Sequence, residues 1–329
     1  MSPPEVKQAT SRVSRAERWD HFLARLGVNR MGHRVKPGLY ALGEPGSESA
    51  VLVTANYTLS FDALRSSLNG TDAYLLVLDT DGINVWCAAG KGTFGTDELV
   101  SKIEATGLAN IVSHRRLILP QLGAAGVSAH EVRDRSGFTV EFGPVRAADL
   151  AKYLKAGRAT SEMRRVRFPL LDRIVLIPVE LKHALLPSLV GAVIIHLLAG
   201  GLAAVGIAAS VLAGIVAFPI LLPWLPFREF SAKGFVLGAV TAAPFAAVLT
   251  RAGGGPHELR ARAWAAAYAL VAVPITAYLA LNFTGSTPFT SRSGVRREIL
   301  RYVPVMAGMA GGSILLAAVL SVLALLGAR

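Results

Sequence analysis

Over the first 160 residues, short apolar runs alternate with segments whose apolar residues recur at helical spacing. Four apolar runs predict buried strands, and they lie at Val51 to Val53, Tyr74 to Leu78, Ile111-Val112 and Phe138 to Phe142. Helical spacing predicts three helices, at 59–68, at 97–105 after a Thr96 cap, and at 147–154. Such alternation predicts an α/β domain in which a parallel sheet carries helices on both faces.

From residue 183 onwards the pattern changes to long apolar runs. Each run approaches the roughly 20 residues that a helix needs to cross a bilayer, and the runs lie at about 183–200, 202–222, 234–250, 263–283 and 303–327. Gly200 and Gly201 join the first two, which predicts a tight hairpin. The sequence therefore predicts a soluble domain at 1–160, a basic juxtamembrane linker at 161–182 and an all-α transmembrane domain of about five helices at 183–329.

Charge is divided in the same way. Residues 1–182 hold 24 Lys and Arg against 19 Asp and Glu, whereas residues 183–329 hold 10 against 3. Twelve Lys and Arg flank one side of the predicted spans, and four flank the other: Arg251, Arg260, Arg262 and Arg329. The positive-inside rule therefore predicts an amino-terminal domain in the cytoplasm and a carboxyl terminus outside.

The net charge of +12 does not predict nucleic-acid binding. Residues 1–182 contribute only 24 − 19 = +5, and many basic residues cluster at the predicted membrane edges. We expect a multi-pass protein of the cytoplasmic (inner) membrane that contacts membrane lipid and no nucleic acid. Only His196 is ionisable deep within an apolar run, so we interpret the membrane half as an anchor rather than a transporter.

A single cysteine, Cys87, occurs in the 329 residues, so an intramolecular disulfide is excluded. Cys87 lies just beyond the apolar run Leu75 to Leu78, and loops at the carboxyl ends of strands form the usual ligand crevice of α/β folds. Thr54 and Asn56 fall at another such end. From the residues alone, Cys87 is a small buried side chain, a nucleophile or a metal ligand.

Two other kinds of site are not favoured. Gly90, Gly92 and Gly95 spell the G-x-G-x-x-G of dinucleotide sites, but residues 110–116 lack the carboxylate expected about 20 positions later. We interpret these glycines as residues that ease a tight turn. One Cys and scattered His residues do not provide the four regularly spaced ligands of a structural zinc site.

The run Asn84-Val85-Trp86-Cys87-Ala88-Ala89-Gly90-Lys91 resembles the signature of the corrinoid protein of microbial mercury methylation (HgcA family), and this octet is unbroken here. The resemblance extends to the corrinoid iron–sulfur protein of acetyl-CoA synthesis. The resemblance to the HgcA family covers nearly the whole chain, and the octet is its specific part. Shorter matching stretches lie at Gly27 to Gly32, Val53 to Tyr57, Leu78 to Gly82, Lys91 to Thr96, Ser113 to Arg116, Pro120 to Gly123, Gly143 to Arg146 and Asn282 to Gly285.

The resemblance implies a Rossmann-like domain that binds a cobalt corrinoid of the cobalamin type, with Cys87 as the lower axial ligand of cobalt. The octet would form a short helix that caps this face of the cofactor. Small residues at 88–90 would let backbone approach the macrocycle, and Lys91 would help to hold the thiolate form. The cofactor-binding residues implied are Thr54, Asn84, Val85, Trp86, Cys87, Ala88, Ala89, Gly90 and Lys91, with Cys87 also catalytic.

The Asp-x-His-x-x-Gly motif of corrinoid proteins with a histidine lower ligand is absent. The function implied is methyl transfer from cobalt to Hg(II), giving methylmercury, and the alternative is a corrinoid methyl carrier in one-carbon metabolism. One Cys cannot hold an iron–sulfur cluster, which takes about four. A separate electron donor is therefore expected, and the resemblance implies the two-cluster ferredoxin-like protein HgcB. It also implies a methyltetrahydrofolate-type methyl donor or its methyltransferase.

Overall fold

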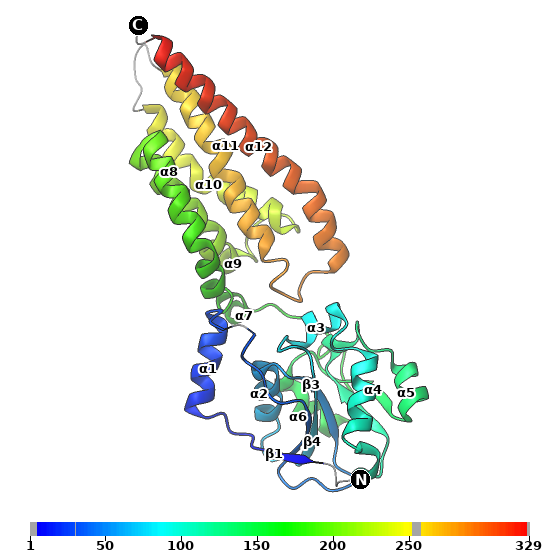
Figure 1. The fold of residues 1–329 in the computed structure, drawn as a ribbon. Coiled ribbons are helices and arrows are strands. Elements are labelled where there is room, and N and C mark those ends of the chain that lie inside the picture. Colours follow the sequence, from blue (N-terminus) through cyan, green and yellow to red (C-terminus); the bar gives the residue numbers. More distant parts are fainter. Residues whose placement is uncertain (1–4, 30, 252–257, 328–329) are drawn as a thin grey trace. The chain divides into compact units, whose positions relative to one another are not determined.

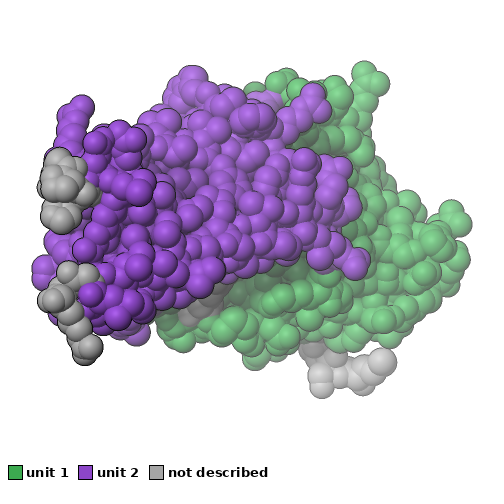
Figure 2. Space-filling view, turned by 90° about the horizontal axis from the view of Figure 1, so that it is seen from above, with its two compact units in different colours: residues 1–166 green, residues 167–329 purple. Residues whose placement is uncertain are grey.

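The computed structural model describes residues 5–29, 31–251 and 258–327. The chain divides into two compact units, Met1–Val166 (unit 1) and Arg167–Arg329 (unit 2) (Figures 1 and 2). Unit 1 contains a six-stranded sheet with helices, and the described part of unit 2 is helical.

The sheet of unit 1 has the strand order β1-β2-β4-β3-β5-β6. Its strands are β1 (Val6–Ala9), β2 (Gly38–Leu42), β3 (Val51–Ala55), β4 (Ala73–Leu78), β5 (Arg116–Leu119) and β6 (Thr139–Phe142). All neighbouring pairs are parallel except β2 and β4, which run antiparallel. The sheet is therefore mixed, whereas the alternation of the sequence predicts only its parallel part.

Helices cover both faces of this sheet (Figure 1). They are α2 (Thr58–Ser67), α3 (Val85–Lys91), α4 (Thr96–Ala105), α5 (Ala129–Ser136) and α6 (Leu150–Ala156). A further helix, α1 (Arg15–Arg25), is joined to α2 by ion pairs. Every residue of β3 and β4 is buried. Alternate side chains divide between two cores: Val53 packs with α3, α4 and α5, whereas Leu52 packs with α2 and α6.

Two local expectations are wrong. Ile111 and Val112 are not a strand, because they follow a 3₁₀ turn, Leu108–Asn110, and the strand lies later, at β5. Val112 is nevertheless buried in the core, so its apolar character reports burial and not backbone conformation. The N-cap of α4 is Gly95 rather than Thr96, whose hydroxyl instead accepts a hydrogen bond from the Ser128 N–H at 2.9 Å.

Unit 2 is built from long apolar helices. They are α7 (Leu170–Ile174), α8 (Ile177–Leu212), α9 (Phe218–Leu221), α10 (Phe230–Arg251), α11 (Glu258–Asn282) and α12 (Arg292–Gly327), with a π-helical turn at Ala213–Ala217. Among the described residues, four helical stretches are long and apolar enough to cross a membrane, and they lie at Leu170–Leu221, Phe230–Arg251, Glu258–Asn282 and Arg292–Leu326.

The first of these stretches contains a reversal of the chain. Gly200 has φ 83° and ψ 173°, outside the helical region. The Arg173 guanidinium donates hydrogen bonds to the carbonyls of Pro219 at 2.7 Å and Ile220 at 3.0 Å. Residues 46 apart in sequence would lie about 70 Å apart on one continuous helix. The hairpin predicted at Gly200 is therefore confirmed, and it gives five apolar segments. His196 lies beside this turn and is exposed, not deep within the packed helices.

Small residues bring α10 and α11 into close contact. A Cβ at Gly234 would lie 2.6 Å from the Ala277 Cα, and one at Gly238 would lie 2.7 Å from the Val273 carbonyl oxygen. These two glycines are four residues apart, so they lie on one face of α10. Small residues at this spacing are typical of helices that pack in membranes, where close approach of backbones replaces the hydrophobic effect.

Gly238→Ala should lower the melting temperature of the purified full-length protein, because the new methyl group meets backbone that cannot rotate away. Overpacking of this kind costs about 1–3 kcal/mol. Gly308→Ala on α12 is the matched control, since a Cβ there meets nothing within 4 Å. Thermal unfolding of both variants in the same detergent checks the expectation. Equal melting temperatures would contradict the close contact between α10 and α11.

Candidate functional site

A buried amide organises the carboxyl edge of the sheet. Asn56, which follows β3, is 2% exposed. Its Oδ1 accepts hydrogen bonds from the Thr80 N–H at 3.0 Å, the Thr80 hydroxyl at 2.9 Å and the Gly82 N–H at 3.0 Å. Its Nδ2 donates to the Asp79 carboxylate at 3.0 Å. This Asn56 hub (Asn56, Asp79, Thr80 and Gly82) fastens the end of β3 to the loop that follows β4.

The loop after β4 turns sharply to start a helix. Asp81 and Gly82 have φ values of 57° and 69°, in the left-handed region. A Cβ at Gly82 would lie 2.7 Å from the Arg34 side chain, so glycine is needed there for space as well as conformation. The Thr80 hydroxyl shares its one proton between the Asn56 Oδ1 and the Ile83 carbonyl oxygen, which lies 2.7 Å away. The chain therefore leaves the hub in a fixed direction and enters α3 two residues later.

Asn84 is the N-cap of α3 and also contacts the thiol. Its Oδ1 accepts a hydrogen bond from the Cys87 N–H at 3.0 Å, and its Nδ2 lies 3.6 Å from the Cys87 Sγ. A backbone N–H can only donate, which places the amide oxygen on that side and leaves the NH₂ group facing sulfur. One side chain thus begins the helix and orients the sulfur. The helix ends at Gly92, whose φ of 91° suits only glycine.

The two faces of α3 have different roles. Val85, Ala88 and Ala89 are buried in the core of unit 1, and Ala88 is 0% exposed. Cys87 lies on the opposite side and is partly exposed. Trp86 and Gly90 are also partly buried, and Lys91 and Asn84 are exposed.

The side chains of Ala88 and Ala89 lie in the core of unit 1, and the approach of residues 88–90 to a cofactor stays a prediction. A Cβ at Gly126 would lie 2.9 Å from the Ala89 Cα and would also collide with the Phe94 carbonyl oxygen. The small inner residues of α3 therefore let the helix pack closely on the backbone of its own unit. Gly90 alone among the three lies on the outer side with Cys87.

Two of the three glycines of the G-x-G-x-x-G pattern join two helices, whereas Gly90 lies within α3. Gly92 ends α3, Gly95 is the N-cap of α4, and a Cβ at Gly95 would lie 2.6 Å from the Gly92 carbonyl oxygen. Dinucleotide sites place this pattern between a strand and a helix. The interpretation as a tight turn is confirmed for Gly92 and Gly95 and is wrong for Gly90, which is helical.

Thr54 does not lie with the octet. It is buried in β3 and alternates with Val53 and Ala55, which share a core with α3. Its side chain therefore projects with that of Leu52 toward the α2 face. Asn56, two residues later, is the residue of this segment that supports α3. The sequence signal that points to Asn56 is its position as a polar residue directly after a buried strand.

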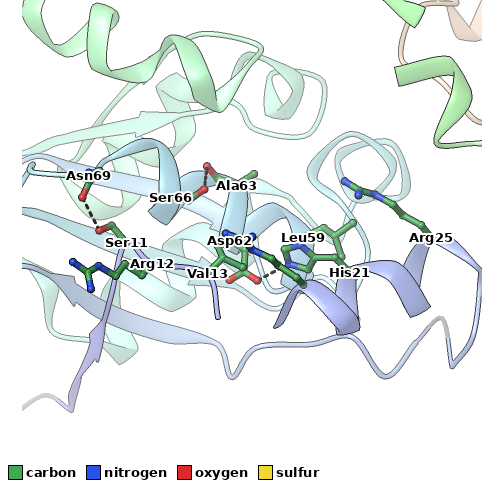
Figure 3. Close-up of a pocket in the computed structure, with 11 residues that line it drawn as sticks. Ser11, Arg12, Val13, His21, Arg25, Leu59, Asp62, Ala63, Ser66 and Asn69 are labelled. Carbon is green, nitrogen blue, oxygen red and sulfur yellow. Dashed lines mark hydrogen bonds and ion pairs between the residues drawn. The ribbon is translucent and has the colours of Figure 1, made fainter. Parts of the chain in front are cut away.

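A separate groove of about 740 Å³ lies between α1 and α2 (Figure 3). None of the octet residues lines it. Its lining residues are Ser11, Arg12, Val13, Arg18, His21, Arg25, Leu59, Asp62, Ala63, Ser66 and Asn69.

Comparison with known proteins places unit 1 near corrinoid proteins. Residues 29–154 match the family described as CO dehydrogenase/acetyl-CoA synthase delta subunit. The acetyl-CoA decarbonylase/synthase complex subunit gamma of Methanopyrus kandleri is 34% identical over 128 residues, which are 38% of this chain and 27% of that protein. The corrinoid/iron-sulfur protein large subunit of Moorella thermoacetica is 30% identical over 129 residues, 39% of this chain and 28% of that protein.

Each of these two relatives is matched over about a quarter of its own length. The family match lies within the α/β part of the chain. It includes α3, the Asn56 hub and all the strands from β2 to β6. Unit 1 is therefore related to the corrinoid protein of the acetyl-CoA pathway.

Replacing Asn56 by alanine should destabilise unit 1 by about 3 kcal/mol, because buried donors of Thr80 and Gly82 and the Asp79 carboxylate lose their partner. Urea unfolding of residues 1–166 expressed alone measures the change. Asn69→Ala is the control, since Asn69 is exposed and accepts one hydrogen bond, from the Ser11 hydroxyl. Equal stabilities of the two variants would show that the hub does not stabilise the loop.

Asn84→Asp and Asn84→Ala separate the two roles of Asn84. Aspartate retains a good N-cap, whereas alanine loses about 1 kcal/mol of helix stability. Both variants lose the N–H that faces sulfur, and the aspartate places a negative charge beside it. We expect alkylation of Cys87, the only thiol, to be slowest in Asn84→Asp even though its fold is the more stable. Unchanged alkylation in both variants would show that the amide does not contact the thiol.

Proposed function

We propose that unit 1 binds a corrinoid with the Cys87 sulfur as lower axial ligand and carries a methyl group to an acceptor. The observation that carries the proposal is the position of Cys87, whose thiol is oriented by Asn84 on the outer face of a fastened helix at the carboxyl edge of the sheet. Ligands of open α/β folds bind at this edge. The relation of unit 1 to proteins named for a corrinoid supplies the cofactor class.

The side chains available around Cys87 fit a site in which the protein provides one axial ligand to the metal. Within residues 5–29, 31–251 and 258–327, no three His, Cys, Asp or Glu side chains gather as they would around a metal held by the protein alone. A single thiol on an outward helix face suits a metal whose other ligands belong to a macrocycle. Beside Cys87, Gly90 adds no side chain to this face. In the proposal, Cys87 ligates, Asn84 holds the sulfur, and Trp86 and Lys91 border the face.

The acceptor we propose is Hg(II). A bound corrinoid would supply the cobalt that carries the methyl group, and an electron-rich thiolate ligand favours its release with electrons to an electrophile such as Hg(II). The unbroken octet from Asn84 to Lys91 and the apolar helices of unit 2 support this acceptor.

A corrinoid methyl carrier in one-carbon metabolism is the second candidate. The names of the relatives favour it over mercury methylation, since they belong to acetyl-CoA synthesis. The relatives are matched over only part of this chain, however, and none of the matched residues reaches unit 2 in the family comparison. The acceptor is therefore decided by experiment.

Two partners and a location complete the proposal. A chain with one cysteine needs an external reductant, and we propose the two-cluster ferredoxin-like protein HgcB for this role. The second partner that we propose is a methyltetrahydrofolate-type methyl donor or its methyltransferase. Unit 2 would cross the cytoplasmic membrane five times, with unit 1 in the cytoplasm. The excess of Lys and Arg on one side of the apolar segments supports this orientation, although Arg329 lies outside the described residues.

Cys87→Ala should abolish methylmercury formation by the full-length protein loaded with methylcobalamin, and should remove the absorbance shift caused by sulfur ligation. Cys87→His should restore an axial ligand but with a nitrogen-type spectrum and weaker transfer to Hg(II). Anaerobic absorbance spectra and methylmercury yield measure both. A Cys87→Ala protein with an unchanged spectrum would contradict the ligand assignment.

The matched control moves the thiol rather than deleting it. Cys87→Ala combined with Ser66→Cys retains one thiol, on the exposed Ser66 of α2, and therefore corrects for mercury bound by sulfur alone. A parallel assay with a nucleophilic thiol acceptor tests the second candidate. Transfer to the thiol and none to Hg(II), with an intact sulfur-ligated spectrum, would favour one-carbon metabolism while leaving corrinoid binding in place.

A further inference from the structure

The outer face of α1 is aromatic. Trp19 and Phe22 are 61% and 49% exposed, and their rings stack with centroids 5.2 Å apart. They project from the side opposite Ala24, which is buried. Val28 and Met31, just after the helix, are also exposed, by 40% and 49%. Large apolar side chains that gather on a soluble surface mark a contact with something outside the unit.

The aromatic pair is held rigidly by the opposite side of α1. Ser14 and Glu17 form a capping box at the start of the helix. Glu17 pairs with the buried Arg65 at 2.6 Å, and His21 Nε2 lies 2.6 Å from the buried Asp62 carboxylate. Burial alone would raise the pKa of Glu17, but hydrogen bonds from Ser14 and Arg65 outweigh it and lower that pKa. These contacts fasten α1 to α2, so its exposed face is preformed.

Positive charge lies beside the aromatic pair. Arg15, Arg18 and Arg25 project from the exposed half of α1, and the structure gives none of them a carboxylate partner among its described residues. The carboxylates of α1 are already engaged, Glu17 by Arg65 and Asp20 by His33. Arg18 and Arg25 are seven residues apart, so they share one flank of the helix. With Arg12, they also line the groove between α1 and α2, and Figure 3 labels Arg12 and Arg25 there.

We propose that α1 docks unit 1 on the surface of a membrane that contains anionic phospholipid. Trp19 and Phe22 enter the headgroup region, and the arginines of α1 contact lipid phosphates. Amphipathic helices with aromatic residues on one face and Arg on the polar flank bind membranes in this way, and Trp is enriched at the level of the headgroups.

The chain itself supplies the reason for choosing lipid over a protein partner. The first apolar stretch begins at Leu170, four residues after unit 1 ends at Val166. Unit 1 is thus tethered within a few residues of any bilayer that unit 2 occupies. Docking by α1 would restrict unit 1 to one orientation on that surface. The proposal rests on membrane insertion of unit 2, but it does not depend on the cofactor or the acceptor.

The single cysteine makes a direct test possible. In a Cys87→Ala background, Phe22→Cys places a nitroxide label on the outer face of α1, and Glu104→Cys places one on the exposed side of α4. The full chain is reconstituted in phosphatidylcholine nanodiscs with or without phosphatidylglycerol. We expect the label at 22, but not at 104, to become several-fold less accessible to a water-soluble nickel relaxant when phosphatidylglycerol is present.

Charge reversal provides the second arm. Arg18→Glu with Arg25→Glu should return the label at 22 to water, whereas Arg133→Glu on α5 should leave it shielded. Equal accessibility at 22 and 104 in both nanodiscs would overturn the proposal. Shielding at 22 that is the same without phosphatidylglycerol and survives charge reversal would also overturn it, because protein rather than lipid would then cover the face.

Discussion

The position of the thiol depends on one buried amide. β3 and β4 are neighbours in the sheet, but their backbone ladder ends where the two loops begin. Beyond that point the three hydrogen bonds accepted by Asn56 and the one it donates to Asp79 continue the connection. The loop can then adopt left-handed conformations at Asp81 and Gly82 without becoming free to move. The octet begins directly after this loop.

The helix that carries Cys87 is seven residues long, far below the length at which an isolated helix is stable in water. Its structure therefore comes from its attachments. Asn84 closes its start, Gly92 closes its end, and the backbone at Gly126 receives its inner face. Several short stretches of the family resemblance meet here. The stretch ending at Tyr57 contributes Asn56, and the stretch ending at Gly82 contributes its partners. The stretch ending at Gly123 packs on Phe94, whose ring would lie 2.6 Å from a Cβ at that glycine.

The sequence predicted those parts of the fold whose signals are continuous. β3, β4 and β6 were visible as apolar runs, and the hairpin at Gly200 as paired glycines between long apolar segments. β1 was missed because none of its four residues is buried. β2 was missed because buried and partly buried positions mix within its five residues, and it joins the sheet antiparallel. The pair Ile111-Val112 misled because it is buried without being a strand. For the site, Cys87 and Asn84 could be named from the octet. The inward direction of Ala88 and Ala89 could not, because it depends on how α3 packs.

The contact of Arg173 with the end of the first hairpin has a consequence for biosynthesis. The carbonyls that accept its hydrogen bonds belong to Pro219 and Ile220, in α9, near the end of the helical segment that follows Gly200. A guanidinium buried in apolar surroundings is strongly driven to keep such partners. The helical segments before and after Gly200 can therefore pack against each other as soon as residue 220 has been synthesised, before α10 exists. If unit 2 inserts into a membrane as proposed, these two segments would enter it as a pair, with the guanidinium already hydrogen-bonded to backbone oxygen.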